Sequence, residues 1–276
     1  MAAQQPIVTL NDGNTMPQLG FGVFQIPDDA VTEAVKSALS AGYRSIDTAQ
    51  GYHNEEGVGR AIQDGGVPRD ELFITTKLTN GEQGYDSTLR AFDASMDKLG
   101  IDVLDLFLIH WPVPSKDLYV ETWKAFVRLK EEGRVRSLGV SNFLEDHLAR
   151  IIGETGVTPV LNQIELHPKF QQKALRAVDE RLGIKTEAWS PIGRGRLLDE
   201  PVLTEIARKH GKTSAQVILR WHLDIGNVVI PKSKTPSRIA ENFQVFDFAL
   251  DADDLARIEA LDAADGRIGP DPANFG

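Results

Sequence analysis

Four polar side chains in the first half of the chain are of types that can carry out acid–base chemistry. They are Asp47, Tyr52, Lys77 and His110. Three of them each end a short apolar segment, and Tyr52 lies five residues after Asp47. A phenol can donate a proton, an ammonium or carboxylate beside it can adjust its acidity, and an imidazole can donate or accept a hydrogen bond.

Eight short apolar segments are typical of β-strands, and helical patterns alternate with them. The expected strands are residues 21–24, 44–47, 72–77, 104–110, 137–140, 160–165, 184–188 and 228–230. The run LDLFLI at 104–109 is apolar almost throughout, as in strands that are covered on both faces. Residues 31, 34, 35, 38 and 39 are apolar at helical spacing, and Gly42 follows as a stop signal. This alternation predicts a parallel sheet, either closed into a barrel or open and doubly wound.

The position of the polar residues at strand ends matters more than any one of them. Taken singly, a strand-end Asp is usually a turn residue, a Lys is solvated, a His packs in a loop and a Tyr lies on the surface. In a parallel barrel, however, the carboxyl ends of all strands lie on one face, where barrel active sites are found. We therefore expect a carboxylate, an ammonium and an imidazole in one bowl, with a phenol beside them.

Several motifs occur in a fixed order along nearly the whole chain, to about residue 265. They are GYRSIDTAQGYHNE at 42–55, LDLFLIHWP at 104–112, GVSN at 139–142, NQIE at 162–165, WSP at 189–191 and IPKS at 230–233. Together they resemble the signatures of the aldo-keto reductases, and they are most similar to the bacterial 2,5-diketo-D-gluconate reductase branch. The resemblance implies an α/β fold, a single (β/α)8 TIM barrel domain over residues 1–276. Apolar runs at 7–10 and 16–19 around Asp12-Gly13 predict an N-terminal β-hairpin.

The resemblance gives the four polar residues roles in the NADPH-dependent reduction of a small aldehyde, ketone or dicarbonyl, with keto sugar acids included. Tyr52 is expected to be the general acid. Lys77 is expected to lower the pKa of Tyr52, and Asp47 to keep Lys77 protonated and in place. His110, expected to be neutral, would orient the carbonyl oxygen. The hydride would come from a nicotinamide, because no side chain can supply one.

The expected cofactor site lacks the Gly-x-Gly-x-x-Gly fingerprint of dinucleotide-binding domains. Two lysines and an arginine between residues 232 and 238, beside Ser233, suit the phosphate on the adenosine ribose of NADP(H). Ser237 is expected to cap the helix that follows. The resemblance implies a full set of cofactor contacts: Gly22, Ser141, Asn142, Gln163, Trp189, Ser190, Lys232, Ser233, Arg238, Glu241 and Asn242.

The expected substrate contacts are Phe24, Tyr52, His110 and Trp111. In the branch that the chain resembles, an aromatic residue often follows the Lys-Leu pair, whereas this chain has Thr79. We expect a wider or more polar pocket at this point. The tail 266–276 shows no periodicity, and the resemblance implies that it covers the active-site face.

Composition excludes several other classes of protein. The chain has no cysteine, so disulfides, thiolate zinc sites and cysteine nucleophiles are excluded, and the histidines show no metal-ligand spacing. The net charge of −10 makes a nucleic-acid partner unexpected. No segment is apolar enough to span a membrane. We therefore expect a cytoplasmic enzyme without a metal, monomeric like the family that it resembles.

Two alternatives remain open from the sequence. A barrel aldolase or lyase could use Lys77 to form a Schiff base. Such an enzyme would need neither Trp189 nor the basic residues 232–238. A subunit that senses NADPH without catalysis is the second alternative, and turnover would distinguish it.

Overall fold

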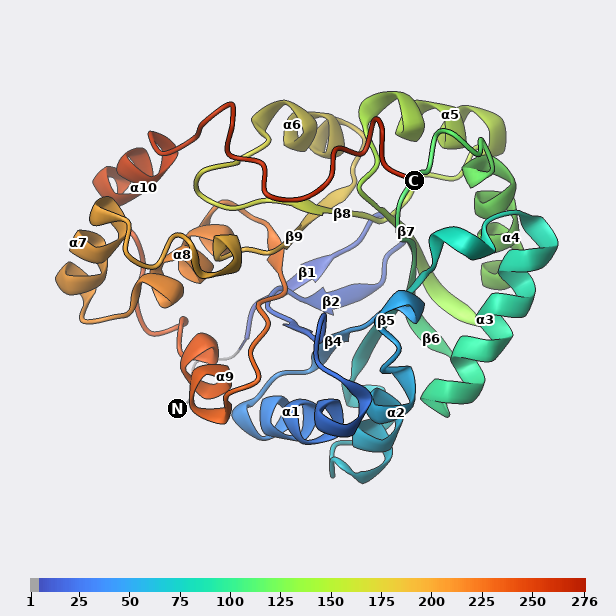
Figure 1. The fold of residues 1–276 in the computed structure, drawn as a ribbon, viewed down its shortest axis with the longest axis horizontal. Helices are drawn as coiled ribbons and strands as arrows, with labels where there is room; N and C mark the ends of the chain where they lie inside the picture. The colour runs from blue at the N-terminus through green and yellow to red at the C-terminus, as the bar shows by residue number, and fades with distance from the viewer. Residues whose placement is uncertain (1–4) are drawn as a thin grey trace.

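Eight parallel strands form the centre of the molecule in a computed structural model that describes residues 5–276 (Figure 1). Their order in the sheet follows their order in the chain, from β3 to β10. They are β3 (Phe21–Gly22), β4 (Ser45–Asp47), β5 (Phe73–Leu78), β6 (Leu104–Ile109), β7 (Val135–Ser141), β8 (Leu161–Glu165), β9 (Lys185–Trp189) and β10 (Val228–Val229). All eight strands expected from the sequence are present.

The sheet closes on itself at a seam between the segment before β3 and β10. Leu19 and Val229 form a parallel bridge. The N–H of Gly20 donates to the carbonyl oxygen of Val229 at 2.8 Å, and the N–H of Val229 donates to that of Gln18 at 2.9 Å. The chains approach closely here, since a Cβ at Gly22 would lie 3.1 Å from the carbonyl oxygen of Ile230. The prediction of a closed barrel, and not an open sheet, is confirmed.

Residues 5–276 form ten α-helices, which surround the strands (Figure 1). They are α1 (Asp28–Ala41), α2 (Glu55–Asp64), α3 (Tyr85–Leu99), α4 (Tyr119–Glu131), α5 (Glu145–Thr155), α6 (Lys173–Arg181), α7 (Pro201–His210), α8 (Ser214–Asp224), α9 (Pro236–Phe243) and α10 (Ala252–Glu259). The five apolar positions expected on one face of α1 are all buried, and Gly42 ends this helix with a φ of 112°. The cap predicted at Ser237 is wrong: Thr235 is the N-cap of α9 and Pro236 its first residue, because proline suits the first helical position.

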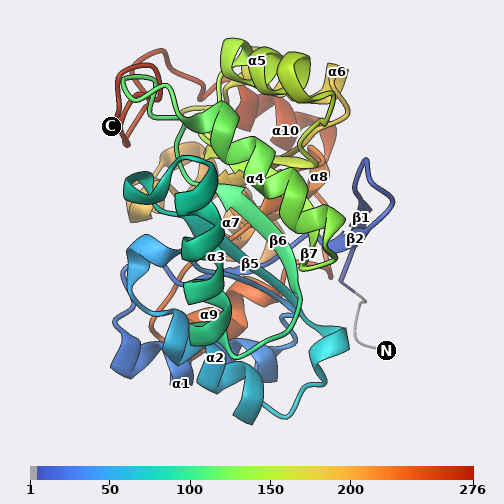
Figure 2. The ribbon, with the colours of Figure 1, turned by 90° about the vertical axis from the view of Figure 1, so that its right-hand side faces the viewer.

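The two ends of the barrel carry different segments. The predicted hairpin is present as β1 (Ile7–Thr9) and β2 (Thr15–Pro17), and Met16 packs with Leu106 and Leu108 of β6 inside one end. The C-terminal tail lies at the opposite end (Figure 2), where the strands have their carboxyl ends. The ring of Phe275 lies 4.4 Å from that of Trp111, centroid to centroid. The tail thus lies over the carboxyl-end face of the barrel, where the resemblance implied that it would be. Among the described residues, no helix is both long and apolar enough to cross a membrane.

Candidate active site

The fold brings the four polar residues of the sequence prediction together at the carboxyl ends of three neighbouring strands. Asp47 is the last residue of β4, and Lys77 is the penultimate residue of β5. His110 follows β6 directly, with its N–H bonded to the carbonyl oxygen of Leu78 at 3.3 Å. Tyr52 ends the short 3-10 helix η1 (Gln50–Tyr52) in the loop between β4 and α2.

Lys77 is buried within this group, and its ammonium has three partners. Its Nζ lies 2.5 Å from Oδ1 of Asp47, and both side chains are buried. The same nitrogen donates to the carbonyl oxygen of Thr48 at 3.0 Å and to the hydroxyl of Tyr52 at 3.4 Å. An ammonium has three hydrogens. All three are therefore directed at neighbours in the site.

The charge state of Lys77 follows from these neighbours. Burial alone would lower the pKa of its ammonium. Asp47, Tyr52 and Glu187 act in the opposite direction and outweigh burial, so that the pKa of Lys77 is raised above its usual value. Lys77 is thus a fixed positive charge at neutral pH.

The ring of Tyr52 lies next to two other aromatic rings. Its ring centroid lies 5.0 Å from that of Phe24 and 5.6 Å from that of His110. Burial raises the pKa of the Tyr52 phenol, whereas Lys77 lowers it, and burial has the larger effect. The expected influence of Lys77 is therefore present, but it does not bring the pKa of Tyr52 below its ordinary value. The phenol keeps its proton at neutral pH and remains available as a donor.

His110 is electrically neutral. Burial, followed by the nearby charge of Lys77, lowers the pKa of its imidazole to about 3. A neutral imidazole carries one N–H and can donate one hydrogen bond to a carbonyl oxygen without supplying a charge. This agrees with the state expected from the sequence.

A second set of polar residues lines the adjacent strand ends of β7, β8 and β9. The amide nitrogen of Asn142 donates to the carbonyl oxygen of His110 at 2.9 Å, and the indole N–H of Trp189 donates to Oδ1 of Asn142 at 2.8 Å. The hydroxyl of Ser141 donates to the carbonyl oxygen of Gln163 at 2.8 Å. Hydrogen bonds thus connect the four residues that are expected to contact nicotinamide, and join them to the backbone of His110. The four are Ser141, Asn142, Gln163 and Trp189.

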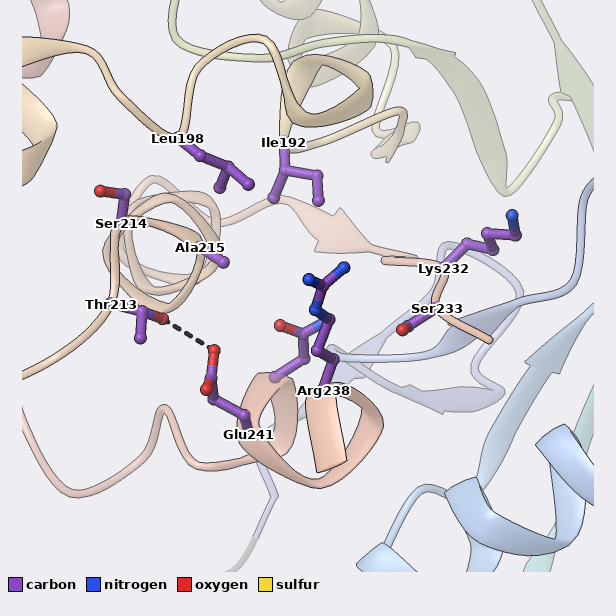
Figure 3. A pocket seen from close by; sticks show the side chains of 10 residues that line it. Ile192, Leu198, Thr213, Ser214, Ala215, Lys232, Ser233, Arg238 and Glu241 are labelled. Carbon is purple, nitrogen blue, oxygen red and sulfur yellow. Dashed lines mark hydrogen bonds between the residues drawn. The ribbon is translucent and has the colours of Figure 1, made fainter. Parts of the chain in front are cut away.

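A cleft of about 340 Å³ lies between the start of α8, the residues that flank the 3-10 turn η4 (Gly193–Gly195), and α9. Figure 3 shows the side chain of Arg238 extending from α9 into the cleft toward Ile192. The cleft is lined by Ile192, Leu198, Thr213, Ser214, Ala215, Lys232, Ser233, Arg238, Glu241 and Asn242. Five of the expected cofactor residues therefore meet here. Gly22 and Ser190 lie outside this lining: Gly22 pairs with Asp47, and Ser190 follows β9 with a φ of 50°.

The charges in the cleft suit an anionic group. Burial, and then the charge of Lys234, lowers the pKa of Lys232. Within residues 5–276, neither Lys232 nor Arg238 pairs with a carboxylate, while Glu241 accepts from the hydroxyl of Thr213 at 3.0 Å. Two cations beside the Ser233 hydroxyl fit a phosphate group. The described residues thus fit the nucleotide expected from the sequence.

Two buried carboxyl groups near the site were missed by sequence analysis. Glu187 lies in β9, and the amide of Gln163 donates to it at 2.6 Å. Its alternation with Trp189 along one strand was the available signal, because residues two apart share a face. Glu165, at the end of β8, binds the backbone N–H groups of Ile268 and Gly269. No local pattern in the tail pointed to this contact.

Comparisons with known proteins agree with this geometry. The model of the Aldo/keto reductase family matches residues 18–263. The chain belongs to the aldo/keto reductase family. It is 57% identical to an aldo-keto reductase of Mycolicibacterium smegmatis over 98% of each chain, and 53% identical to methylglyoxal reductase DkgA of Escherichia coli over 99% of each. The crystal structure of a Gox0644 mutant in complex with NADPH is 55% identical, with a TM-score of 0.96 over 99% of each chain.

Proposed function

We propose that this aldo-keto reductase uses NADPH to reduce a small aldehyde, ketone or dicarbonyl to the alcohol, with Tyr52 as the general acid. Family membership makes the chain an NADP(H)-dependent oxidoreductase. The observation that carries the assignment of Tyr52 is its contact with the buried Lys77–Asp47 pair, with His110 on its other side.

The side chains of two neighbouring regions would hold the cofactor. Bound NADPH supplies the hydride that reduces the carbonyl carbon. Ser141, Asn142 and Gln163 would bind its carboxamide, and the flat ring of Trp189 would stack on the nicotinamide. Lys232, Ser233 and Arg238 would bind the phosphate of the ribose, with Glu241 and Asn242 facing the adenine. Gly22 and Ser190 complete the proposed set of contacts.

The proton follows a short path within the chain. Tyr52 donates the proton of its hydroxyl to the carbonyl oxygen as negative charge builds there. The phenolate that remains lies beside the Lys77 ammonium, which stabilises it, and Asp47 holds that ammonium in place. Neutral His110 donates its N–H to the same carbonyl oxygen and orients it.

The substrate would sit under an aromatic rim. Phe24 is 47% exposed beside Tyr52, and Trp111 packs against Phe275 of the tail. Methylglyoxal, named for the Escherichia coli relative, is the first substrate to test, because Thr79 in place of an aromatic residue should make the pocket wider or more polar. We further propose that residues 1–276 act as one domain and as a cytoplasmic monomer.

The buried position of Lys77 argues against a Schiff-base mechanism. A lysine must lose its proton to attack a carbonyl group, which is why such lysines have lowered pKa values. Here the pKa of Lys77 is raised, and its three hydrogens are directed at Asp47, Thr48 and Tyr52.

The test is a panel of carbonyl substrates, followed by the loss of NADPH absorbance, with NADH in parallel. We expect turnover of methylglyoxal with NADPH, and loss of that turnover in Tyr52→Phe. NADPH should still quench the tryptophan fluorescence of this variant with nearly the same Kd. Turnover that survives in Tyr52→Phe would remove the general acid from the mechanism, and binding of NADPH without any turnover would favour a sensing subunit.

A further inference from the structure

A second carboxyl group lies inside the barrel next to the proposed catalytic group. Glu187 of β9 is paired in register with Gln163 of β8, and it is 1% exposed. The Gln163 amide nitrogen donates to Oε2 of Glu187 at 2.6 Å and to Oδ2 of Asp47 at 2.8 Å. Glu187 is thus joined to the Lys77–Asp47 pair through one amide group. The proton path proposed above gives it no role.

These two contacts fix the orientation of the Gln163 amide. An amide nitrogen has two hydrogens, and here each is directed at a carboxyl oxygen. The reverse orientation would place the amide oxygen against Asp47, whose carboxylate can only accept hydrogen bonds. The Gln163 amide oxygen is therefore turned away from both acids, and no donor from residues 5–276 reaches it. It remains available to a ligand that has an N–H group.

The surroundings of Glu187 disfavour its ionised form. The charged groups that shift the pKa of Glu187 are Asp47 of β4 and Lys77 of β5. The charge of Glu187 in turn affects the pKa of Tyr52, which lies in η1. One ammonium therefore faces two carboxyl groups. Burial, then the charge of Asp47, raises the pKa of Glu187 to about 8. At neutral pH Glu187 is a neutral acid, and it becomes a second anion in mildly alkaline solution.

We propose that Glu187 is a positioning residue: its neutral carboxyl group fixes the Gln163 amide, and its ionisation makes the Tyr52 phenol a weaker acid. The inference rests on the proposed function of Tyr52. The charge of Glu187 raises the pKa values of both Tyr52 and Lys77. A negative charge here opposes the phenolate that forms when Tyr52 gives up its proton. Glu187 thereby sets the alkaline limit of carbonyl reduction.

The first experiment reads Tyr52 without cofactor or turnover. The ionisation of tyrosine is followed by ultraviolet absorbance in wild type and in Glu187→Gln. The curve of the same protein with Tyr52→Phe is subtracted from each, so that only Tyr52 remains. We expect the midpoint of Tyr52 in Glu187→Gln to be lower by roughly one pH unit, because a neighbouring negative charge has been removed. The matched control is Asp179→Asn. Asp179 is a buried acid of α6 that accepts hydrogen bonds from Asn162 of β8 and Thr186 of β9, the strands that also carry Gln163 and Glu187. An unchanged midpoint in Glu187→Gln overturns the proposal.

A second measurement does not require the Glu187 variant to fold. Glu55, Asp179 and Glu187 are the described acids whose pKa is raised. In the background Glu55→Gln with Asp179→Asn, the infrared carbonyl band of a protonated carboxyl group should persist at pH 7. That band should disappear with a midpoint near pH 8. Absence of such a band at pH 7 overturns the proposal.

The anchoring role has its own readout in NADPH affinity. Glu187→Leu leaves the Gln163 N–H without its acceptor, so we expect NADPH to bind about tenfold more weakly by fluorescence titration. Glu187→Gln retains an acceptor oxygen and should restore affinity; equal affinities of all three proteins contradict the anchoring role.

The steady-state pH profile separates failure of this inference from failure of the proposed function. We expect kcat/KM for reduction to fall near pH 8 in wild type and to stay level there in Glu187→Gln. If wild type is active, Tyr52→Phe is inactive and Glu187→Gln keeps the wild-type profile, only the role of Glu187 is wrong.

Discussion

Glu165 binds Gly269, and this contact fastens the C-terminal tail to the end of β8. Oε2 of Glu165 accepts the N–H of Gly269 at 2.8 Å, and Oε1 accepts that of Ile268 at 2.6 Å. Burial would raise the pKa of Glu165, but hydrogen bonds from His167 and from the two tail residues outweigh it and lower the pKa. One buried carboxylate thus holds the tail beside Trp189, since a Cβ at Gly269 would lie 2.4 Å from that ring.

Replacing Glu165 by glutamine should loosen the tail. The amide has only one acceptor oxygen, so one of the two charge-assisted hydrogen bonds is lost, each worth about 1.5–3 kcal/mol. We expect the KM of the carbonyl substrate to rise about tenfold, with little change in the Kd of NADPH, and residues 266–276 to be cleaved faster by protease. The control is Glu205→Gln, an exposed glutamate that pairs with Arg257. Unchanged KM and cleavage would show that Glu165 does not hold the tail.

Part of this site was predictable because it follows from strand position alone. Asp47, Lys77 and His110 each end an apolar run, and parallel strands place their carboxyl ends on one face. The phenol could be placed beside them because only five residues separate Tyr52 from Asp47. For these residues, local sequence and barrel topology together specify the site.

The remaining parts depend on contacts between distant segments. For Glu187 the sequence offered only its alternation with Trp189, and its contacts with Gln163 and, through it, Asp47 required the register between β8 and β9. The hydrogen bond between Glu165 and Gly269 joins residues that are 104 positions apart, and the tail has no periodicity that would predict its path. The seam strands β3 and β10 are only two residues long, because part of their pairing is carried by flanking residues such as Gly20.

Arg238→Ala should weaken NADPH binding much more than NADH binding. The guanidinium lies in the cleft beside Lys232 and Ser233, without a carboxylate partner among the described residues, so a phosphate is its expected ligand. Loss of a charged hydrogen bond predicts an increase of about 10- to 100-fold in the Kd of NADPH. Fluorescence titrations with both cofactors give the two Kd values, and Arg208→Ala, exposed on α7, is the control. Equal effects on both cofactors would remove the phosphate contact.

Lys77→Met should reduce kcat strongly while leaving NADPH affinity within about threefold of wild type. The ammonium stabilises the Tyr52 phenolate, and positioned acid–base groups contribute about 10²- to 10⁴-fold to rate. In Lys77→Met, Asp47 would be a buried charge without its partner, which lowers the free energy of unfolding by about 3–5 kcal/mol. The double variant Asp47→Asn with Lys77→Met removes both charges and is therefore the comparison that should remain folded. Single-turnover rates measure the effect, and Lys124→Met, exposed on α4, is the control. A normal rate in the double variant would exclude electrostatic assistance by Lys77.

Asp179→Asn should stabilise the protein in alkaline but not in acidic solution. Burial raises the pKa of Asp179 to about 7 in the folded protein, from an ordinary value of 3.8. The folded state therefore binds this proton more tightly than the unfolded chain, so its contribution to stability is complete below about pH 4 and is lost as pH rises through 7. Asparagine stays neutral, so its advantage in free energy of unfolding should grow by up to about 4 kcal/mol between pH 4 and pH 8. Urea unfolding at both pH values measures this difference, and Asp253→Asn, at an exposed position, is the control. A difference that does not change with pH would mean that Asp179 has the same pKa in the folded protein as in the unfolded chain.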